Sequence, residues 1–192
     1  MKTWFFALAF IFAAPIVSAH EWNVASKDST VSFVSVKKSV IAEAHSLSGI
    51  EGNIRSDGHF ELTIPLKTVE TGIDIRNERM QSMLFDVTRY PKVILSANLP
   101  KNLLKSMPVG TTQTKEIPAQ LALHGKIKRI NFEVLIVKLS HRKVVVTSVK
   151  PTIINASDFN LSSGIKALMQ IASLSSISTA VPVSFVLTLK RD

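Results

Sequence analysis

The sequence predicts an all-β protein with one or two short helices, whose strands form a single antiparallel eight-stranded barrel. Apolar and polar residues alternate along most of the chain, as in the segment Phe-Glu-Leu-Thr-Ile at 60–64. Such alternation is typical of antiparallel strands that bury one face. Turn-forming residues, such as Ser-Asp-Gly at 56–58 and His-Gly at 124–125, separate these segments at hairpin spacing. Closure into a barrel removes the exposed edges that so many strands would otherwise present.

Eight segments carry the strand pattern, one for each strand of the expected barrel. The segment at 130–139 differs from the others because both of its faces are apolar, with Leu135 and Val137 opposite Val134 and Ile136. Either a helix or a partner subunit could cover its outer face, so a homodimer is one expectation. The segments are 30–36, 48–54, 60–64, 93–98, 120–123, 130–139, 144–149 and 181–191.

One short amphipathic helix is expected between the third and fourth strands. Met80, Met83, Leu84 and Val87 follow the i, i+3, i+4, i+7 spacing that places apolar groups on one helical stripe. We expect Asp74 to be its N-cap, and the proline at position 91 ends the helix at or before residue 90. A second short helix is expected at 164–174, before the last strand.

The first 19 residues have the pattern of a cleaved export signal. Lys2 precedes an apolar run at 4–17, and Val-Ser-Ala at 17–19 matches the small-x-small cleavage pattern. We therefore expect residues 1–19 to be a signal peptide and residues 20–192 to form one domain. This predicts a periplasmic or secreted protein.

Composition excludes several classes of protein. The chain has no cysteine, which excludes a disulfide framework, thiol catalysis and thiolate metal sites. Its formal net charge is +9, but the basic residues are spread in short groups without interleaved aromatics. This distribution argues against nucleic-acid binding and leaves weak contact with an anionic membrane surface as an expectation.

No motif for catalysis or metal binding is found. A nucleophilic serine would need a Gly-x-Ser-x-Gly turn or a similar activated site, and none is present. The five histidines lack the spacing of a metal-binding motif. The sequence thus predicts no catalytic residue, no metal site, no cofactor and no enzymatic activity.

The segment at 71–91 resembles the central motif of the YceI-like family. In that family the motif contains Thr-Gly, then Arg-Asp-Glu, an apolar residue, Phe-Asp-Val and Tyr-Pro; here Asn77 replaces the aspartate and Leu84 a frequent phenylalanine. Three other segments are similar to family patterns, namely 29–33, 121–125 and 157–159, although Asn160 replaces the glycine that follows the last of them. An aromatic residue that the family prefers after Gly49 is replaced by Glu51. The resemblance covers nearly all of residues 20–192.

This resemblance implies a lipocalin-like barrel and a secreted bacterial protein that binds a long-chain apolar molecule of the polyisoprenoid, quinone or fatty amide type. It also suggests transport or a stress response, beside membrane cytochromes. We expect Arg76, Asn77 and Arg79 to lie near a polar head group. The apolar candidates for the ligand-binding tunnel are Phe33, Phe60, Leu62, Met80, Met83, Leu84, Phe85, Leu95, Phe132, Phe159, Met169, Phe185 and Leu187.

Two other interpretations stay open from the sequence. An eight-stranded barrel either fills with its own side chains or holds one small ligand. If it is filled, the protein would act through its surface, as an interaction protein or as a homodimer. A metal-free enzyme would require a buried polar cluster, which the sequence does not reveal.

Overall fold

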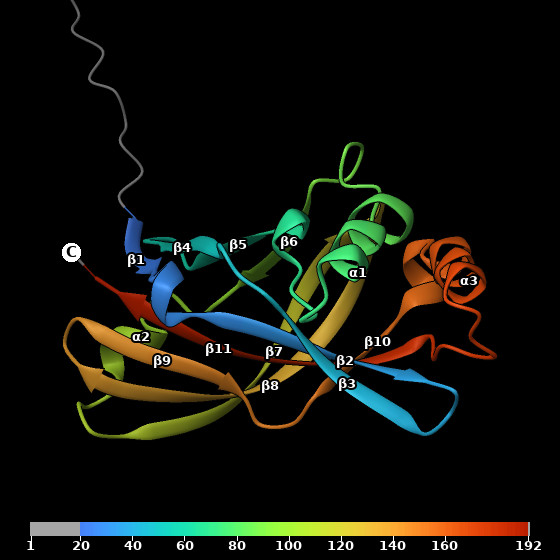
Figure 1. Ribbon diagram of the computed structural model, residues 1–192. Coiled ribbons are helices and arrows are strands. Elements are labelled where there is room, and N and C mark those ends of the chain that lie inside the picture. The colour runs from blue at the N-terminus through green and yellow to red at the C-terminus, as the bar shows by residue number, and fades with distance from the viewer. Residues whose placement is uncertain (1–19, 192) are drawn as a thin grey trace, which may run out of the picture.

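The computed structural model describes residues 20–191, and the predicted signal peptide at 1–19 lies outside the described residues. Eleven strands and three α-helices make up most of this part (Figure 1). The strands are β1 (His20–Val24), β2 (Thr30–Lys37), β3 (Ile41–Leu47), β4 (Glu51–Arg55), β5 (His59–Pro65), β6 (Lys92–Asn98), β7 (Thr112–Leu123), β8 (Lys126–Ser140), β9 (Lys143–Ser148), β10 (Thr152–Asn155) and β11 (Ala180–Lys190).

The strands form one closed antiparallel barrel. Its ring runs β1-β4-β5-β6-β7-β8-β9-β11, and pairing of β1 with β11 closes it. The other three strands continue members of this ring. Along one edge of β11, β2 continues β1, and along the other edge β10 continues β9. In the same way, β3 and β4 are two parts of one barrel strand. The eleven strands are therefore eight barrel strands, three of them interrupted at 25–29, 48–50 and 149–151. The predicted eight-stranded antiparallel barrel is confirmed.

Each predicted strand corresponds to one strand of the barrel, but the boundaries differ. The segments β1, β3 and β10 were not predicted, and β7 begins at Thr112 rather than at 120. The missed part of β7 reads Thr-Gln-Thr-Lys-Glu-Ile-Pro-Ala, and most of its side chains are exposed. A strand with few apolar residues to bury lacks the alternation on which the prediction rests.

The predicted hairpin turn between β7 and β8 is also confirmed. Leu123 pairs with Lys126, so His124 and Gly125 form a two-residue connection, and both have positive φ (47° and 75°). This is the backbone of a type I′ turn, which matches the twist of the two strands. His124 packs on the Tyr90 ring, with the ring centroids 4.3 Å apart.

The first helix differs from its prediction in both start and geometry. Helix α1 (Asp74–Arg79) has Ile73 at its N-cap position, without a side-chain cap, so the assignment of Asp74 as N-cap is wrong. The chain then continues as one π-helical turn, Met80–Leu84, where the Phe85 N–H donates to the Met80 carbonyl. Val87 lies beyond this turn, so the four apolar residues do not share one α-helical stripe.

Helices cover both ends of the barrel. Helix α3 (Ser162–Ile171) packs against the π-helical turn that continues α1, at one end of the barrel, which we call the mouth. The short helix α2 (Leu103–Ser106) lies at the opposite end, beside the turn between β8 and β9 (Figure 1). No helix within residues 20–191 has both the length and the hydropathy needed to cross a membrane.

A buried lysine joins α2 to the barrel. Lys138, on β8, is 3% exposed, and its Nζ donates a hydrogen bond of 2.8 Å to the Leu104 carbonyl of α2. The same Nζ lies 4.5 Å from the centroid of the Trp22 ring, a cation–π arrangement. Burial, and secondarily the charge of Arg191, lower the pKa of Lys138. Lys138 therefore links α2 to the barrel at the end opposite the mouth, although burial of its charge costs free energy.

Replacement of Lys138 by methionine tests this role. Lys138→Met keeps an apolar chain in the same space but leaves the Leu104 carbonyl without its donor, a loss of about 1–3 kcal/mol in the free energy of unfolding. Urea denaturation measures the difference. Lys128→Met, at an exposed position on the same strand, is the control and should change stability by less than about 0.5 kcal/mol. Equal effects of the two variants would contradict the assigned role.

Candidate functional site

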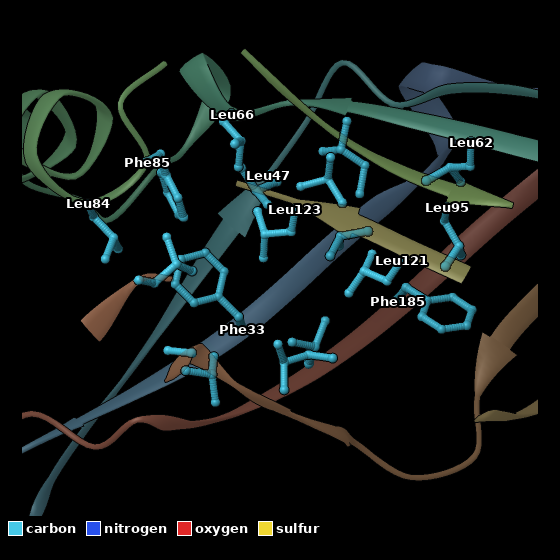
Figure 2. A pocket seen from close by; sticks show the side chains of 18 of the residues that line it. Phe33, Leu47, Leu62, Leu66, Leu84, Phe85, Leu95, Leu121, Leu123 and Phe185 are labelled. Carbon is cyan, nitrogen blue, oxygen red and sulfur yellow. The ribbon is translucent and has the colours of Figure 1, made fainter. Parts of the chain in front are cut away.

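The lumen of the barrel contains an apolar cavity at the mouth end. Its volume is about 180 Å³, and all 21 side chains that line it are aliphatic or aromatic. Strands from around the barrel contribute most of them, and Leu84 comes from the π-helical turn (Figure 2). Ile165 comes from α3, the other helical element that covers the mouth. Apolar cavities of this order stay free of water and can bind an apolar ring. The barrel is therefore not completely filled by its own side chains.

A second apolar cavity lies deeper in the barrel, toward α2. It measures about 70 Å³ and is lined in part by Leu103 and Leu104. Phe132 and Phe185 line both cavities, and their rings meet edge to face with the centroids 5.9 Å apart. Together with Leu95 and Leu187, which also line both cavities, this aromatic pair forms a partition between them.

Nine of the sixteen predicted site residues line one or both cavities. Eight of them line the mouth cavity, and Phe60 lines the deeper one only. In Figure 2 the side chains of Phe33, Leu84 and Phe85 surround the same space as Leu95 and Phe185. The eight residues that line the mouth cavity are Phe33, Leu62, Leu84, Phe85, Leu95, Phe132, Phe185 and Leu187.

Four predicted apolar residues do not line either cavity. Phe159 is 1% exposed and packs in the core, where the next residue, Asn160, adopts a left-handed φ of 58° that asparagine tolerates. Met80 is also buried in the core, while Met83 and Met169 are only partly buried. Because the helix changes to π geometry at Met80, the chain carries Leu84 and Phe85, rather than the two methionines, to the cavity wall.

Five of the thirteen lining residues that sequence reasoning missed share a strand face with predicted ones. Val31, Ile64 and Val93 are two residues from Phe33, Leu62 and Leu95, so the period-two rule could have found them. Leu47 and Ile154 lie on strands that were not predicted at all. The other residues missed are Leu66, Leu121, Leu123, Ala156, Leu161, Ile165, Val181 and Val183.

The predicted polar residues Arg76, Asn77 and Arg79 lie on α1 and do not line the cavity. Arg76 Nη1 pairs with the Glu43 carboxylate at 2.8 Å, and Lys37 Nζ reaches the same oxygen at 2.7 Å. A hydrogen bond from Lys37 is the main reason that the pKa of Glu43 is lowered. This ion cluster fixes α1 to the β2–β3 hairpin beside the mouth.

Asn77 organises the turn before α1. Its Oδ1 accepts hydrogen bonds from the Thr71 backbone N–H at 2.9 Å and from the Thr71 hydroxyl at 2.6 Å. Its Nδ2 donates to Glu70 Oε1 at 3.2 Å. An aspartate could accept the first two bonds but could not donate the third. Asparagine at this position is therefore matched to its Glu70 neighbour.

His45 is a buried histidine beside the mouth cavity. It is 4% exposed, its Nε2 shares a 2.8 Å hydrogen bond with the Ser35 hydroxyl, and its ring lies 5.2 Å from that of Phe33. Burial, followed by the charge of Arg76, lowers the pKa of His45 below its ordinary value of 6.5. Glu43 acts in the opposite direction, and Lys37 adds to the lowering.

The low pKa of His45 predicts an acid-sensitive fold. Below pH 6.5 the unfolded chain binds a proton at His45 more readily than the folded protein, so stability falls, by up to about 1.4 kcal/mol per pH unit. Above that pH both states are neutral and the stability is fully present. Urea denaturation between about pH 5 and 7.5 measures the slope. His45→Asn should flatten it, and an unchanged slope would contradict the assignment.

No group of three or more metal-ligating side chains occurs among residues 20–191. The predictions that the protein has no metal, no cofactor and no enzymatic activity stay predictions.

Comparisons with known proteins agree with this architecture. The model of the YceI-like domain matches residues 22–189. Among solved structures, a polyisoprenoid binding domain from Saccharophagus degradans, implicated in plant cell wall breakdown, has 33% sequence identity and a TM-score of 0.88, over 91% of this chain and 100% of that one. BcnA from Burkholderia cenocepacia has 17% identity and a TM-score of 0.67, over 86% and 98% of the two chains. No curated protein matches the chain.

The family match spans nearly the whole barrel, from Trp22 in β1 to Leu189 in β11. It includes the mouth helices and the segment at 71–91, which carries the central motif of the family. The Saccharophagus degradans domain is covered over its full length and shares the fold closely. The chain belongs to the YceI-like family.

Proposed function

We propose that this protein is an exported carrier that holds one long apolar lipid, of the polyisoprenoid, quinone or fatty amide type, inside its barrel. The observation that carries the proposal is the lumen cavity, whose lining is entirely apolar. Polyisoprenoid binding by the Saccharophagus degradans domain, at 33% identity over its whole length, supports the same class of ligand.

Burial of a hydrocarbon chain supplies enough free energy for such a function. Each methylene removed from water contributes roughly 0.8 kcal/mol, so about twelve carbons contribute nearly 10 kcal/mol. Ordering the chain and losing its free motion cost several kcal/mol of that sum. The remainder corresponds to micromolar or tighter binding. No hydrogen bond to the tail is needed, in keeping with a cavity wall made of hydrocarbon.

The length of the ligand depends on the aromatic partition. A tail confined to the mouth cavity must be short, because about 180 Å³ is below the usual range of ligand pockets. A long tail requires Phe132 or Phe185 to rotate and join the second cavity of about 70 Å³. We therefore propose that the barrel elongates its lumen as the tail enters.

Native mass spectrometry of the gently purified protein tests the carrier. A co-purifying lipid, or uptake of an added prenyl lipid in a one-to-one ratio, is the expected result. A mass equal to that of the bare protein, with no uptake, would instead favour the filled-barrel interaction protein. Turnover of the extracted lipid would favour an enzyme. Export, contact with anionic membranes and homodimer formation stay predictions that cell fractionation, vesicle sedimentation and light scattering can test.

A further inference from the structure

The inner face of the β2–β3 hairpin changes from apolar to polar as it leaves the lumen. Val31 pairs with Leu47, and both line the mouth cavity. The next pair on the same face is Phe33 with His45, because successive side chains on one face are two residues apart. Phe33 lines the cavity and lies 5.2 Å from the His45 ring, measured between centroids. His45 is thus the first polar side chain reached along this face from the cavity.

Three buried side-chain atoms among residues 20–191 have no hydrogen-bond partner, and two of them belong to His45 and Arg76, beside the β2–β3 hairpin. Nε2 of His45 is engaged with Ser35, but its Nδ1 is not paired, although the residue is 4% exposed. Nε of Arg76 is likewise buried and unpaired, while Nη1 of the same side chain binds Glu43 and Nη2 donates to the Thr71 carbonyl. Buried polar groups in folded proteins are nearly always paired, so each exception calls for an explanation.

The chemistry of these two atoms defines the group that would satisfy them. Arg76 Nε–H can only donate, whereas His45 Nδ1 donates or accepts according to its tautomer. One hydroxyl or carbonyl oxygen meets the requirement of the arginine. A hydroxyl can also donate to the neutral imidazole, and a carbonyl can accept from it.

A charged head group fits this place poorly. Arg76 Nη1 and Lys37 Nζ both bind Glu43 Oε2, and Arg76 Nη2 donates to the Thr71 carbonyl, so the outer donors of the guanidinium are already engaged. A diphosphate would need a free fork of donors, and it would meet the negative charge of Glu43 at the same place.

We propose that His45 and Arg76 form a head-group subsite that selects an uncharged, oxygen-bearing lipid head over an anionic one. The proposal rests on the proposed function, because the subsite acts on a lipid whose tail occupies the lumen. Ser35 and Glu43 are positioning residues: the first fixes the imidazole and the second fixes the guanidinium.

Four compounds that share one prenyl tail test the subsite: farnesol, farnesal, farnesyl diphosphate and the headless hydrocarbon farnesene. We expect farnesol or farnesal to bind the full-length mature protein about tenfold tighter than farnesene, in displacement of a fluorescent fatty probe. Farnesyl diphosphate should bind no tighter than farnesene. A preference between alcohol and aldehyde then reports which tautomer of His45 faces the ligand.

Two variants locate the selectivity. His45→Phe keeps a ring against Phe33 and removes both nitrogens, so farnesol should bind no better than farnesene, whose own affinity should not change. Arg76→Lys keeps the charge beside Glu43 and removes the Nε–H, and it should reduce the preference for farnesol. Circular dichroism of each variant confirms that the barrel is folded.

The outcomes separate this proposal from the proposed function. Equal affinity of the wild-type protein for farnesol and farnesene would overturn the subsite and leave the carrier intact. Tightest binding of farnesyl diphosphate would likewise overturn it, in favour of an anion site. Failure of all four compounds to bind, farnesene included, would overturn the carrier itself.

Discussion

Leu121→Trp should abolish lipid uptake without unfolding the barrel. Leu121 is 8% exposed, lines the mouth cavity and pairs across the sheet with Leu95, another lining residue. An indole at this position would occupy much of the space of about 180 Å³ that a tail would need. Because the cavity can receive the larger ring, the change in the free energy of unfolding should stay within about 1–2 kcal/mol. Affinity for a prenyl lipid should fall at least about 100-fold.

A matched control lies one residue away on the same strand. Gln120 is exposed on the outer face of the barrel, so Gln120→Trp adds the same aromatic side chain outside the lumen. Uptake measured by native mass spectrometry should be unchanged in this variant. If Leu121→Trp retained the lipid as well as the wild type does, the lipid would have to bind outside the lumen. Loss of uptake in both variants would point to general damage to the sheet.

The lumen could be predicted to the extent that its residues alternate. Leu62, Leu95 and Phe185 belong to strands with a regular apolar face, and each of them lines the cavity. This prediction does not depend on which strands pair with one another, because any strand with one apolar face must bury that face. Ring closure followed from the number of such strands and the cost of unpaired edges.

The inward-facing residues at the mouth could not be predicted in the same way, because there the strands extend beyond the apolar lumen. The inner face of β3 reads Leu47, His45, Glu43, which has no apolar repeat beyond its first member. These polar residues face inward because Arg76, some thirty residues later in the chain, supplies a partner for Glu43. Such a long-range ion pair leaves no local signal in the sequence.

The helical residues show a second limit. The spacing of Met80 and Met83 assumes a constant 3.6-residue period, whereas the π-helical turn widens the chain just there. Leu84 and Phe85 reach the cavity as a result, and both methionines are held away from it. This turn packs against α3, which lies about eighty residues later in the chain, so its surroundings leave no local signal in the sequence.

Gly164→Ala should loosen the helical cover of the mouth. A Cβ built on Gly164 would lie 2.6 Å from the Met83 carbonyl oxygen and 2.7 Å from Leu84 Cα, and both are backbone atoms. Alanine favours the helix by up to about 1 kcal/mol, but the overlap forces α3 away from the π-helical turn at a cost of about 1–3 kcal/mol. We therefore expect a net loss of about 1 kcal/mol in stability, and a larger loss for Gly164→Val.

The displacement should affect the ligand more than the fold. Leu84 and Ile165, which line the cavity from the two sides of this helical contact, would separate as α3 moves. A bound prenyl lipid should then dissociate at least about tenfold faster, because α3 and the π-helical turn no longer have to separate before the lipid can leave. Stopped-flow displacement of a fluorescent fatty probe measures the rate, and urea denaturation measures the stability.

Ser163→Ala provides the comparison for this experiment. It adds no atom, lies in the same turn of α3 and is exposed, so both stability and lipid dissociation should stay close to those of the wild type. An increase in stability of Gly164→Ala, with unchanged lipid release, would show that helix propensity outweighs the overlap. The close approach of α3 to residues 83–84 would then have no part in closing the mouth.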